Sequence, residues 1–131
     1  MDKQYKPLGY NSVSPYLVVD GAQKMIDLLK LIFDAKELRR YDRPDGKIMH
    51  AEIQIDDSVI MLGDSSDEFT PNQLLMHIYV PDVDETFNKA ISLGCQSIEL
   101  PTLKDNDPDR RGSFKDFAGN VWAIGTQLGE K

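Results

Sequence analysis

The residues best suited to chemistry lie on an alternating stretch in the first half of the chain. Within residues 48–55, His50, Glu52 and Gln54 alternate with apolar residues. Alternation with a period of two predicts a half-buried strand, which places these three polar side chains on one face. An imidazole beside a carboxylate suits ligand binding, or proton transfer by His50 tuned by Glu52. An ordinary polar strand face is the alternative that the same pattern allows.

An internal repeat indicates which elements position this strand. Short apolar strands at residues 16–20 and 78–82 each end in aspartate, and an apolar helix face follows each of them. An offset of 62 residues relates the two copies, and it also relates residues 61–63 to residues 123–125. Asp20 with Gln23, and Asp82 with Glu85, have the spacing of a helix N-terminal cap. Three further strand patterns follow each helix: 37–41, 48–55 and 58–62, then 97–100, 113–116 and 121–125.

These patterns predict an α+β fold in which two tandem βαβββ units form a curved mixed sheet around a cleft. We expect one domain over residues 13–126, with repeat units at about 13–64 and 74–126. Residues 1–12 and 127–131 are expected to be tails. A polar loop is expected from Thr102 to Asp109, with the strand after it starting at Ser113.

Composition narrows the function classes. The chain has 131 residues, 15 basic and 22 acidic side chains, and a formal net charge of −7. The basic residues are scattered, which argues against binding to nucleic acid or to anionic membranes. Cys95 is the only cysteine, so no intramolecular disulfide can form, as is typical of a reducing compartment. No apolar stretch reaches transmembrane length, so the expected location is the cytoplasm.

Longer motifs run from about Val13 to Thr126. They are PYLVV (15–19) with GA (21–22), PDGKI (44–48) with HAE (50–52), DSVIML (57–62), HIYVPDVD (77–84), RRG (110–112) and DFAGNVW (116–122). Together they resemble the vicinal oxygen chelate superfamily, which comprises glyoxalases, bleomycin resistance proteins and dioxygenases. Within it the chain is most similar to the PhnB-like branch. The resemblance implies the two-unit fold and a small organic ligand, but no particular reaction.

The resemblance also implies where a metal ion would sit. Metal-using members place four ligands, usually His, Gln or Glu, on the first and last strands of the two units. Carried over by register, these positions are Ser14, Met61, Met76 and Ala123. Methionine and alanine side chains are unsuitable ligands for the hard or borderline divalent ions of such enzymes. No cofactor is therefore expected.

Other residues allow two readings each. Arg110 is suited to hold a carboxylate or phosphonate, or to pair with nearby aspartates. Tyr16 and Trp122 suit an aromatic pocket, although Trp122 suits core packing equally well. His77 follows Met76 and is expected to point away from the cleft, but a register slip of one residue would turn it toward His50 and Glu52.

The sequence thus favours a metal-free binding protein for a small organic molecule, and the resemblance adds a homodimer. Its candidate ligand-binding residues are Tyr16, His50, Glu52, Gln54, Met61, Met76, Arg110 and Trp122. The alternative is a metal-dependent lyase, isomerase or dioxygenase that uses His50, Glu52 and His77 as ligands to a divalent metal. A third reading is a metal-independent enzyme that transfers protons through His50, with Glu52 as the second candidate catalytic residue.

Overall fold

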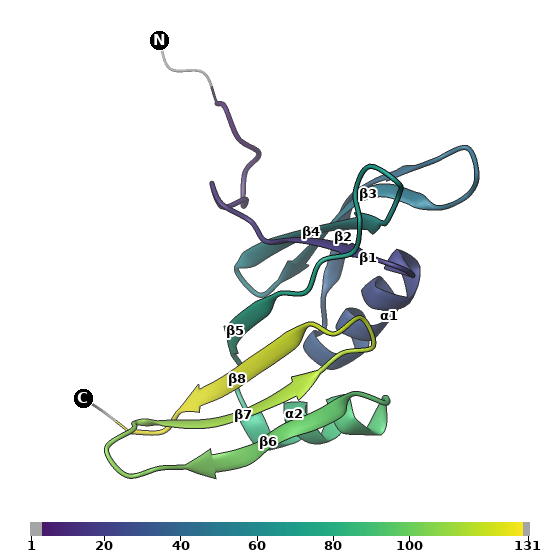
Figure 1. Cartoon of the computed structure of the whole chain (residues 1–131). Helices are drawn as coiled ribbons and strands as arrows, with labels where there is room; N and C mark the ends of the chain where they lie inside the picture. The colour runs from purple at the N-terminus through teal and green to yellow at the C-terminus, as the bar shows by residue number, and fades with distance from the viewer. Residues whose placement is uncertain (1–3, 130–131) are drawn as a thin grey trace. The chain divides into compact units, whose positions relative to one another are not determined.

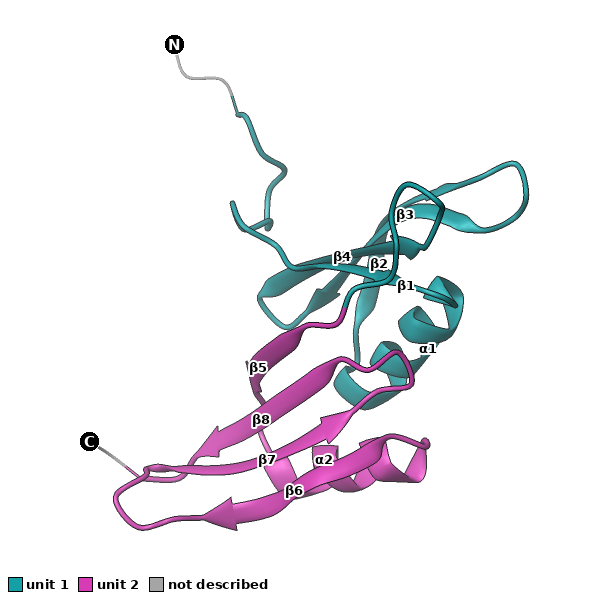
Figure 2. Cartoon of the chain, viewed as in Figure 1, with its two compact units in different colours: residues 1–72 teal, residues 73–131 magenta. Residues whose placement is uncertain are grey.

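The computed structural model describes residues 4–129 and divides into two compact units. Figure 2 colours unit 1, which ends at Asn72, and unit 2, which begins at Gln73. Each unit is described by itself below. Within the described residues, no helix is both long enough and apolar enough to cross a membrane.

The described part of unit 1, residues 4–72, contains one helix and four strands (Figure 1). In chain order these are β1 (Tyr16–Val19), α1 (Ala22–Phe33), β2 (Lys36–Asp42), β3 (Ile48–Ile55) and β4 (Ser58–Asp64). The strands form a sheet with the order β1-β4-β3-β2, in which β1 is parallel to β4 and the other pairs are antiparallel. The parallel pair requires a crossover, and α1 supplies it.

Unit 2 repeats this topology. Its elements are β5 (Leu75–Tyr79), α2 (Val83–Ser92), β6 (Gln96–Leu103), β7 (Asp109–Lys115) and β8 (Val121–Gln127). The sheet order is β5-β8-β7-β6, again with one parallel pair, between β5 and β8. The predicted α+β fold of two βαβββ units is confirmed.

Each helix covers one face of its own sheet and forms a core there. On the helix side of unit 1 the largest fully buried side chains include Leu17, Val19, Met25, Ile26, Leu29, Ile53 and Leu62. Ile48 and Val59 are also fully buried, but Val59 pairs with Gln54 and so lies on the opposite face. In unit 2 the largest fully buried side chains are Phe114, Trp122 and Ile124. Full burial of such a side chain contributes about 1.5–3 kcal/mol. The face opposite each helix is therefore the one where polar side chains can serve another purpose.

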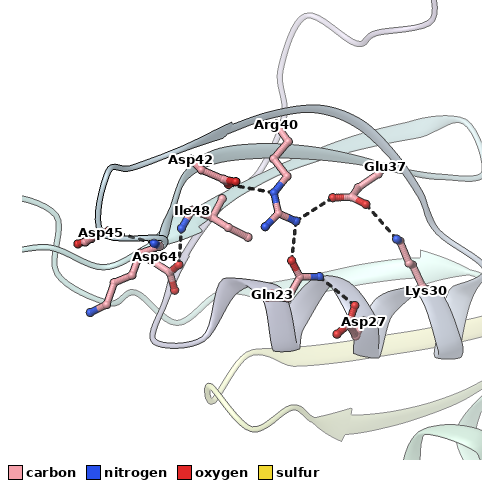
Figure 3. A network of polar contacts seen from close by, with 10 residues as sticks. Gln23, Asp27, Lys30, Glu37, Arg40, Asp42, Asp45, Ile48 and Asp64 are labelled. Atoms are coloured by element: carbon pink, nitrogen blue, oxygen red, sulfur yellow. Dashed lines mark hydrogen bonds and ion pairs between the residues drawn. The ribbon is translucent and has the colours of Figure 1, made fainter.

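Polar residues of β2 also anchor it to α1 in unit 1 (Figure 3). Arg40 donates hydrogen bonds from Nη1 to Gln23 Oε1 on α1 at 2.5 Å and to Glu37 Oε1 at 3.2 Å. Glu37 in turn accepts from Lys30 Nζ at 3.0 Å. Through these hydrogen bonds the charged side chains of β2 that face the helix hold the strand against α1.

The start of α1 differs from the sequence-based expectation. Asp20 is not its cap, because the N-cap is Gly21, whose left-handed φ of 101° suits glycine. Asp64, at the end of β4, accepts the backbone N–H groups of Gly21 at 3.1 Å and Ala22 at 2.9 Å. The predicted cap of α2 is confirmed, since the Asp82 side chain accepts from the Glu85 N–H at 3.1 Å.

The register of the first strands also differs by one residue. Tyr16 pairs with Met61 and His77 pairs with Ala123, so the offset is 61 residues in the first strands and 62 in the last. Met76 instead pairs with the buried Trp122. Neighbours in register point to the same side of a sheet, and a one-residue slip inverts the side chains. His77 thus lies on the face opposite α2, and its predicted orientation was wrong.

The predicted polar loop before β7 is shorter than expected. β6 continues to Leu103 and β7 already begins at Asp109. Arg110 and Arg111 are therefore strand residues that point to opposite faces. The sequence does not indicate this strand start, because residues 104–113 contain only polar residues, glycine and proline and so show no apolar alternation.

Candidate functional site

The face of the unit 1 sheet opposite α1 gathers polar and aromatic residues from several strands. Glu52 on β3 and Tyr16 on β1 both pair with Met61 on β4, so the three side chains share this face. His50 lies two residues before Glu52 on the same side, and Tyr41 of β2 pairs with it. Four strands thus contribute to one surface, which we call the open face of unit 1.

A chain of hydrogen bonds crosses this open face. The Tyr16 hydroxyl lies 2.9 Å from His50 Nδ1, and His50 Nε2 lies 2.8 Å from Glu52 Oε2. An ionised carboxylate only accepts, so His50 Nε2 donates to Glu52. In the neutral imidazole, Nδ1 is then the acceptor of the Tyr16 O–H. The other carboxylate oxygen, Glu52 Oε1, accepts from the Tyr10 hydroxyl at 2.5 Å.

Glu52 is the buried end of this chain, with 4% of its surface exposed. Burial by itself raises the pKa of Glu52, but hydrogen bonds from Tyr10 and His50 and the nearby charge of Arg39 outweigh it and lower the pKa below its ordinary value. Arg39 Nε lies 4.0 Å from Glu52 Oε1. The carboxylate is therefore a charged acceptor at neutral pH.

Tyr16 is the accessible end of the chain, with 39% of its surface exposed. Burial and the charge of Glu52 both raise the pKa of its hydroxyl, so Tyr16 stays protonated and donates a hydrogen bond to His50. Its oxygen lone pairs remain to receive a donor from outside. The rings of Tyr16 and Tyr41 lie 5.5 Å and 6.2 Å from the His50 ring, which limits how the imidazole can turn.

The remaining candidates from the sequence lie elsewhere. Gln54 is on β3, where its Nε2 donates to the Asp56 carbonyl at 3.1 Å, outside the hydrogen-bond chain. Trp122 belongs to the core of unit 2 at 1% exposure, and its Nε1 donates to Asp116 Oδ2 at 2.9 Å. Arg110 turns to α2, where its Nε donates to Asp84 Oδ2 at 2.8 Å. Met76 shares the α2 side with Trp122.

A second polar cluster lies on the face of the unit 2 sheet opposite α2. Arg111 donates from Nη1 to His77 Nε2, from Nε to Asp107 Oδ2 and from Nη2 to Asp109 Oδ2, each at 2.8 Å. Tyr79 donates to Asp109 Oδ2 at 2.7 Å and contacts the His77 ring edge-on. Two aspartates thus already engage Arg111, which disfavours it as a clamp for an external anion.

The two clusters occupy equivalent places in the repeat. Tyr16 and His50 become His77 and Arg111 when 61 is added to each number, and in both units a hydrogen bond joins the pair. The position of Glu52, opposite Met61, corresponds to Ser113, opposite Ala123. In unit 2 the buried carboxylate joined to the pair is instead Asp109, two residues before Arg111 on the same strand.

The residues at the superfamily's metal positions do not fit a metal ion. In the observed register the first-strand residues opposite Met61 and Ala123 are Tyr16 and His77, not Ser14 and Met76, but Met61 and Ala123 still offer no suitable donor. The Ser14 Oγ is buried without a hydrogen-bond partner and is at most one weak ligand. Among residues 4–129, no group of three or more His, Cys, Asp or Glu side chains is arranged to hold a metal.

Sequence reasoning missed Tyr10, Arg39 and Tyr79 as site residues, and of the pair Arg110 and Arg111 it selected Arg110. Tyr10 lies outside any periodic element, so nothing in the sequence signals its contact with Glu52, 42 residues away. Arg111 and Asp109 do share a period of two, and that pattern was the available signal.

Comparison with known proteins places this geometry in context. A family model described as "Glyoxalase/Bleomycin resistance protein/Dioxygenase superfamily" matches residues 9–124. An uncharacterised protein of Mycobacterium bovis is 35% identical, over 91% of this chain and 85% of the relative.

Solved structures resemble the chain in fold. TioX from Micromonospora sp. ML1 has a TM-score of 0.70 at 20% identity, covering 89% of this chain and 100% of that one. A Bacillus cereus PhnB protein, described as a putative 3-demethylubiquinone-9 3-methyltransferase, has a TM-score of 0.68 at 14% identity, covering 88% and 99%. At these identities the likeness concerns the fold alone.

Proposed function

Because the chain belongs to the glyoxalase/bleomycin resistance protein/dioxygenase superfamily, we propose that it binds a small organic molecule on the open face of unit 1, at the Tyr16 hydroxyl. The observation that carries the proposal is the hydrogen-bond chain from Tyr16 through His50 to Glu52. Superfamily members are diverse in chemistry, so the function is inferred from the residues of this face rather than from the fold.

The chain of hydrogen bonds fixes Tyr16 for recognition before any ligand arrives. Its proton is directed to His50, so the ligand is received by oxygen lone pairs in a set orientation. Met61 lies beside it on the same face and offers a half-buried, adaptable apolar surface. A few fixed polar groups next to apolar surface are typical of small-molecule sites. Preorganisation of this kind reduces the entropy lost on binding.

We propose that this binding requires no metal ion. Both ring nitrogens of His50 already have partners, so a metal ion at His50 would have to displace Tyr16 or Glu52. We further propose that the chain belongs to the PhnB-like branch, from the motifs of its sequence; the Bacillus cereus PhnB protein has the same fold. A cytoplasmic homodimer completes the proposal, and sedimentation at micromolar concentration tests the dimer.

The same chain supports a second candidate function, metal-independent proton transfer. Tyr16 would take a proton from a substrate X–H while its own O–H proton passes to His50 Nδ1. The X–H bond and the old O–H bond break as a new O–H and an N–H bond form. The resulting imidazolium would be stabilised by the Glu52 carboxylate at 2.8 Å.

A fragment screen by protein-observed NMR tests the binding proposal. We expect hits that shift the amide resonances of β1, β3 and β4, with affinity reduced about fivefold or more in Tyr16→Phe, since a hydrogen bond contributes about 1 kcal/mol. Tyr5→Phe, at a tyrosine 85% exposed, is the matched control and should leave affinity unchanged. The proposal fails when no fragment binds this face, or when Tyr16→Phe binds the hits as tightly as the wild type.

Hydrogen exchange separates the two candidate functions. Hits with an acidic C–H bond are incubated with the protein in deuterium oxide and followed by NMR. Catalysed exchange that is lost in His50→Gln supports proton transfer. Binding with no exchange above the uncatalysed rate leaves the binding function and rejects the second candidate.

A further inference from the structure

Tyr10 lies on the open face of unit 1 like a bound aromatic molecule. Its hydroxyl donates to Glu52 Oε1 at 2.5 Å, and the Arg39 guanidinium carbon lies 5.5 Å from its ring centroid. A charge-assisted hydrogen bond thus holds the tip of the ring, and a cation–π contact holds its face. Neither contact depends on the ring being part of the polypeptide.

The groups that hold Tyr10 belong to the sheet. Arg39 lies on β2 and Glu52 on β3, two strands that pair with each other, and Arg39 Nε lies 4.0 Å from Glu52 Oε1. Glu52 is held from the other side by His50. Glu52 is therefore positioned by His50 as well as by Tyr10, and Arg39 lies beside it on the neighbouring strand.

Tyr10 itself belongs to a segment with little regular structure. Residues 4–15 contain no helix or strand. Near Tyr10 the segment is held by the Tyr10 N–H to the Pro7 carbonyl at 3.2 Å, and by Asn11 Oδ1, which accepts the Val59 N–H at 3.1 Å. Exchange of the Tyr10 ring for another molecule would thus disrupt few bonds and no strand.

The charges of Glu52 and Arg39 determine which chemical groups could bind in place of the Tyr10 ring. Glu52 is almost fully buried and ionised, so a molecule that replaces Tyr10 must bring a hydrogen-bond donor. A carboxylate or phosphate is repelled by Glu52, and an ammonium group is disfavoured by Arg39. A neutral hydroxyl on an aromatic ring satisfies both Glu52 and Arg39.

We propose that the place of the Tyr10 ring, between Glu52 and Arg39, is a binding subsite for a phenolic group of the ligand, which Tyr10 occupies in the free protein. This inference rests on the proposed function and adds a ligand class to it. The chain Tyr10–Glu52–His50–Tyr16 would then join the subsite to the hydroxyl at which the rest of the ligand binds.

Chemical rescue tests the subsite. In full-length Tyr10→Gly, 4-methylphenol should raise the melting temperature by several degrees and shift the amide resonances of Arg39 and Glu52. Toluene, which lacks the hydroxyl, and 4-methylbenzoate, which is anionic, should not. Adding Glu52→Gln to Tyr10→Gly should weaken 4-methylphenol binding about tenfold or more. Equal responses to toluene and 4-methylphenol, or no response to either, would overturn the subsite.

A measurement on the wild type covers the case in which Tyr10→Gly fails to fold. Saturating 4-methylphenol should move the 13C-labelled ring signals of Tyr10 toward those of the exposed Tyr5. Tyr10 signals that stay unchanged up to the solubility limit of 4-methylphenol would contradict displacement.

The outcomes also separate this inference from the proposed function. Rescue depends on Tyr10, Arg39 and Glu52, whereas the proposed function is read at Tyr16. Fragments that bind at Tyr16 without rescue by 4-methylphenol would reject the subsite alone. Rescue together with a fragment screen that gives no binding at Tyr16 would reject the proposed function alone.

Discussion

His50 and Glu52 lie two residues apart on β3, and a hydrogen bond of 2.8 Å joins His50 Nε2 to Glu52 Oε2. Because side chains alternate along a strand, this spacing places both on the same face. The bond leaves His50 Nδ1 for Tyr16, at 2.9 Å. The two-residue spacing on β3 thus allows hydrogen bonds to connect the buried Glu52 carboxylate, through His50, to the accessible Tyr16 hydroxyl.

The two histidines should occupy opposite tautomers. His50 Nε2 faces a carboxylate, which accepts, whereas His77 Nε2 faces Arg111, which donates. At a pH where both rings are neutral, long-range 1H–15N NMR should show His50 protonated on Nε2 and His77 protonated on Nδ1. The same tautomer at both residues would contradict one of the two hydrogen-bond assignments. Arg111→Lys should disturb the His77 signals and leave those of His50 in place.

Replacing Glu52 by glutamine should destabilise the chain by about 1–3 kcal/mol. The glutamine amide lacks the negative charge to which Tyr10 and His50 donate hydrogen bonds, and its NH2 group cannot accept a hydrogen bond from either residue. Urea denaturation followed by circular dichroism measures the change. Glu68→Gln, at an exposed residue, is the control and should stay within about 0.5 kcal/mol of the wild type. A Glu52→Gln variant as stable as that control would show that the buried hydrogen bonds contribute little.

Asp64 should make folding sensitive to acid. Burial raises the pKa of Asp64, but the N–H groups of Ala22, Ile48 and Gly21, with the charge of Arg43, lower it overall. A carboxyl whose pKa is lower in the folded state stabilises fully above its unfolded value, about 3.9 for aspartate, and this stability is lost as the pH falls further toward the folded value. Asp64→Asn should be about 1–2 kcal/mol less stable at neutral pH.

Urea midpoints measured from about pH 6 down to about pH 3 test this sign, because stability should fall more steeply in the wild type than in Asp64→Asn. Asp67→Asn, in an exposed stretch, should follow the wild-type curve. Parallel curves for the wild type and Asp64→Asn would contradict the role assigned to Asp64.

Cys95 should resist alkylation in the folded chain. It is 7% exposed, and burial, followed by the charge of Asp116, raises the pKa of its thiol to about 11. Since the thiolate is the reactive form, iodoacetamide at pH 8 should label native protein about 100-fold more slowly than urea-unfolded protein. Mass spectrometry reads a single adduct, because the chain has one cysteine. Equal rates in the two states would mean that Cys95 is accessible.

Much of the fold could be predicted because periodic patterns are local. The strand at 48–55 was predictable with its observed bounds, since apolar and polar residues alternate from Met49 to Ile55. The alternation fails only at its start, where Ile48 is buried and Met49 is exposed. The cap at Asp82 was also predictable, because it acts on Glu85 three residues away. The cap of α1 was not, because Asp64 lies 43 residues after Gly21 and acts through the sheet.

The candidate site was predictable only in part, for two physical reasons. The sequence suggests one offset of 62 for both ends of the repeat, but the first strands are related by 61 residues. This difference of one residue exchanges the faces of Met76 and His77. Tyr10 and Arg39 reach Glu52 through tertiary structure, from an irregular segment and from an edge strand. His50 and Glu52 could be predicted as neighbours because they lie two residues apart on one strand.

The metal content of the untagged, purified protein tests the central claim most directly, because the proposed site is built from hydrogen bonds among its own side chains. Plasma mass spectrometry after incubation with zinc, nickel, manganese or ferrous ions, followed by desalting, should find far less than one ion per chain and no change in melting temperature. Near-stoichiometric metal that is lost in His50→Ala or Glu52→Gln would contradict the account and favour a metal-dependent enzyme.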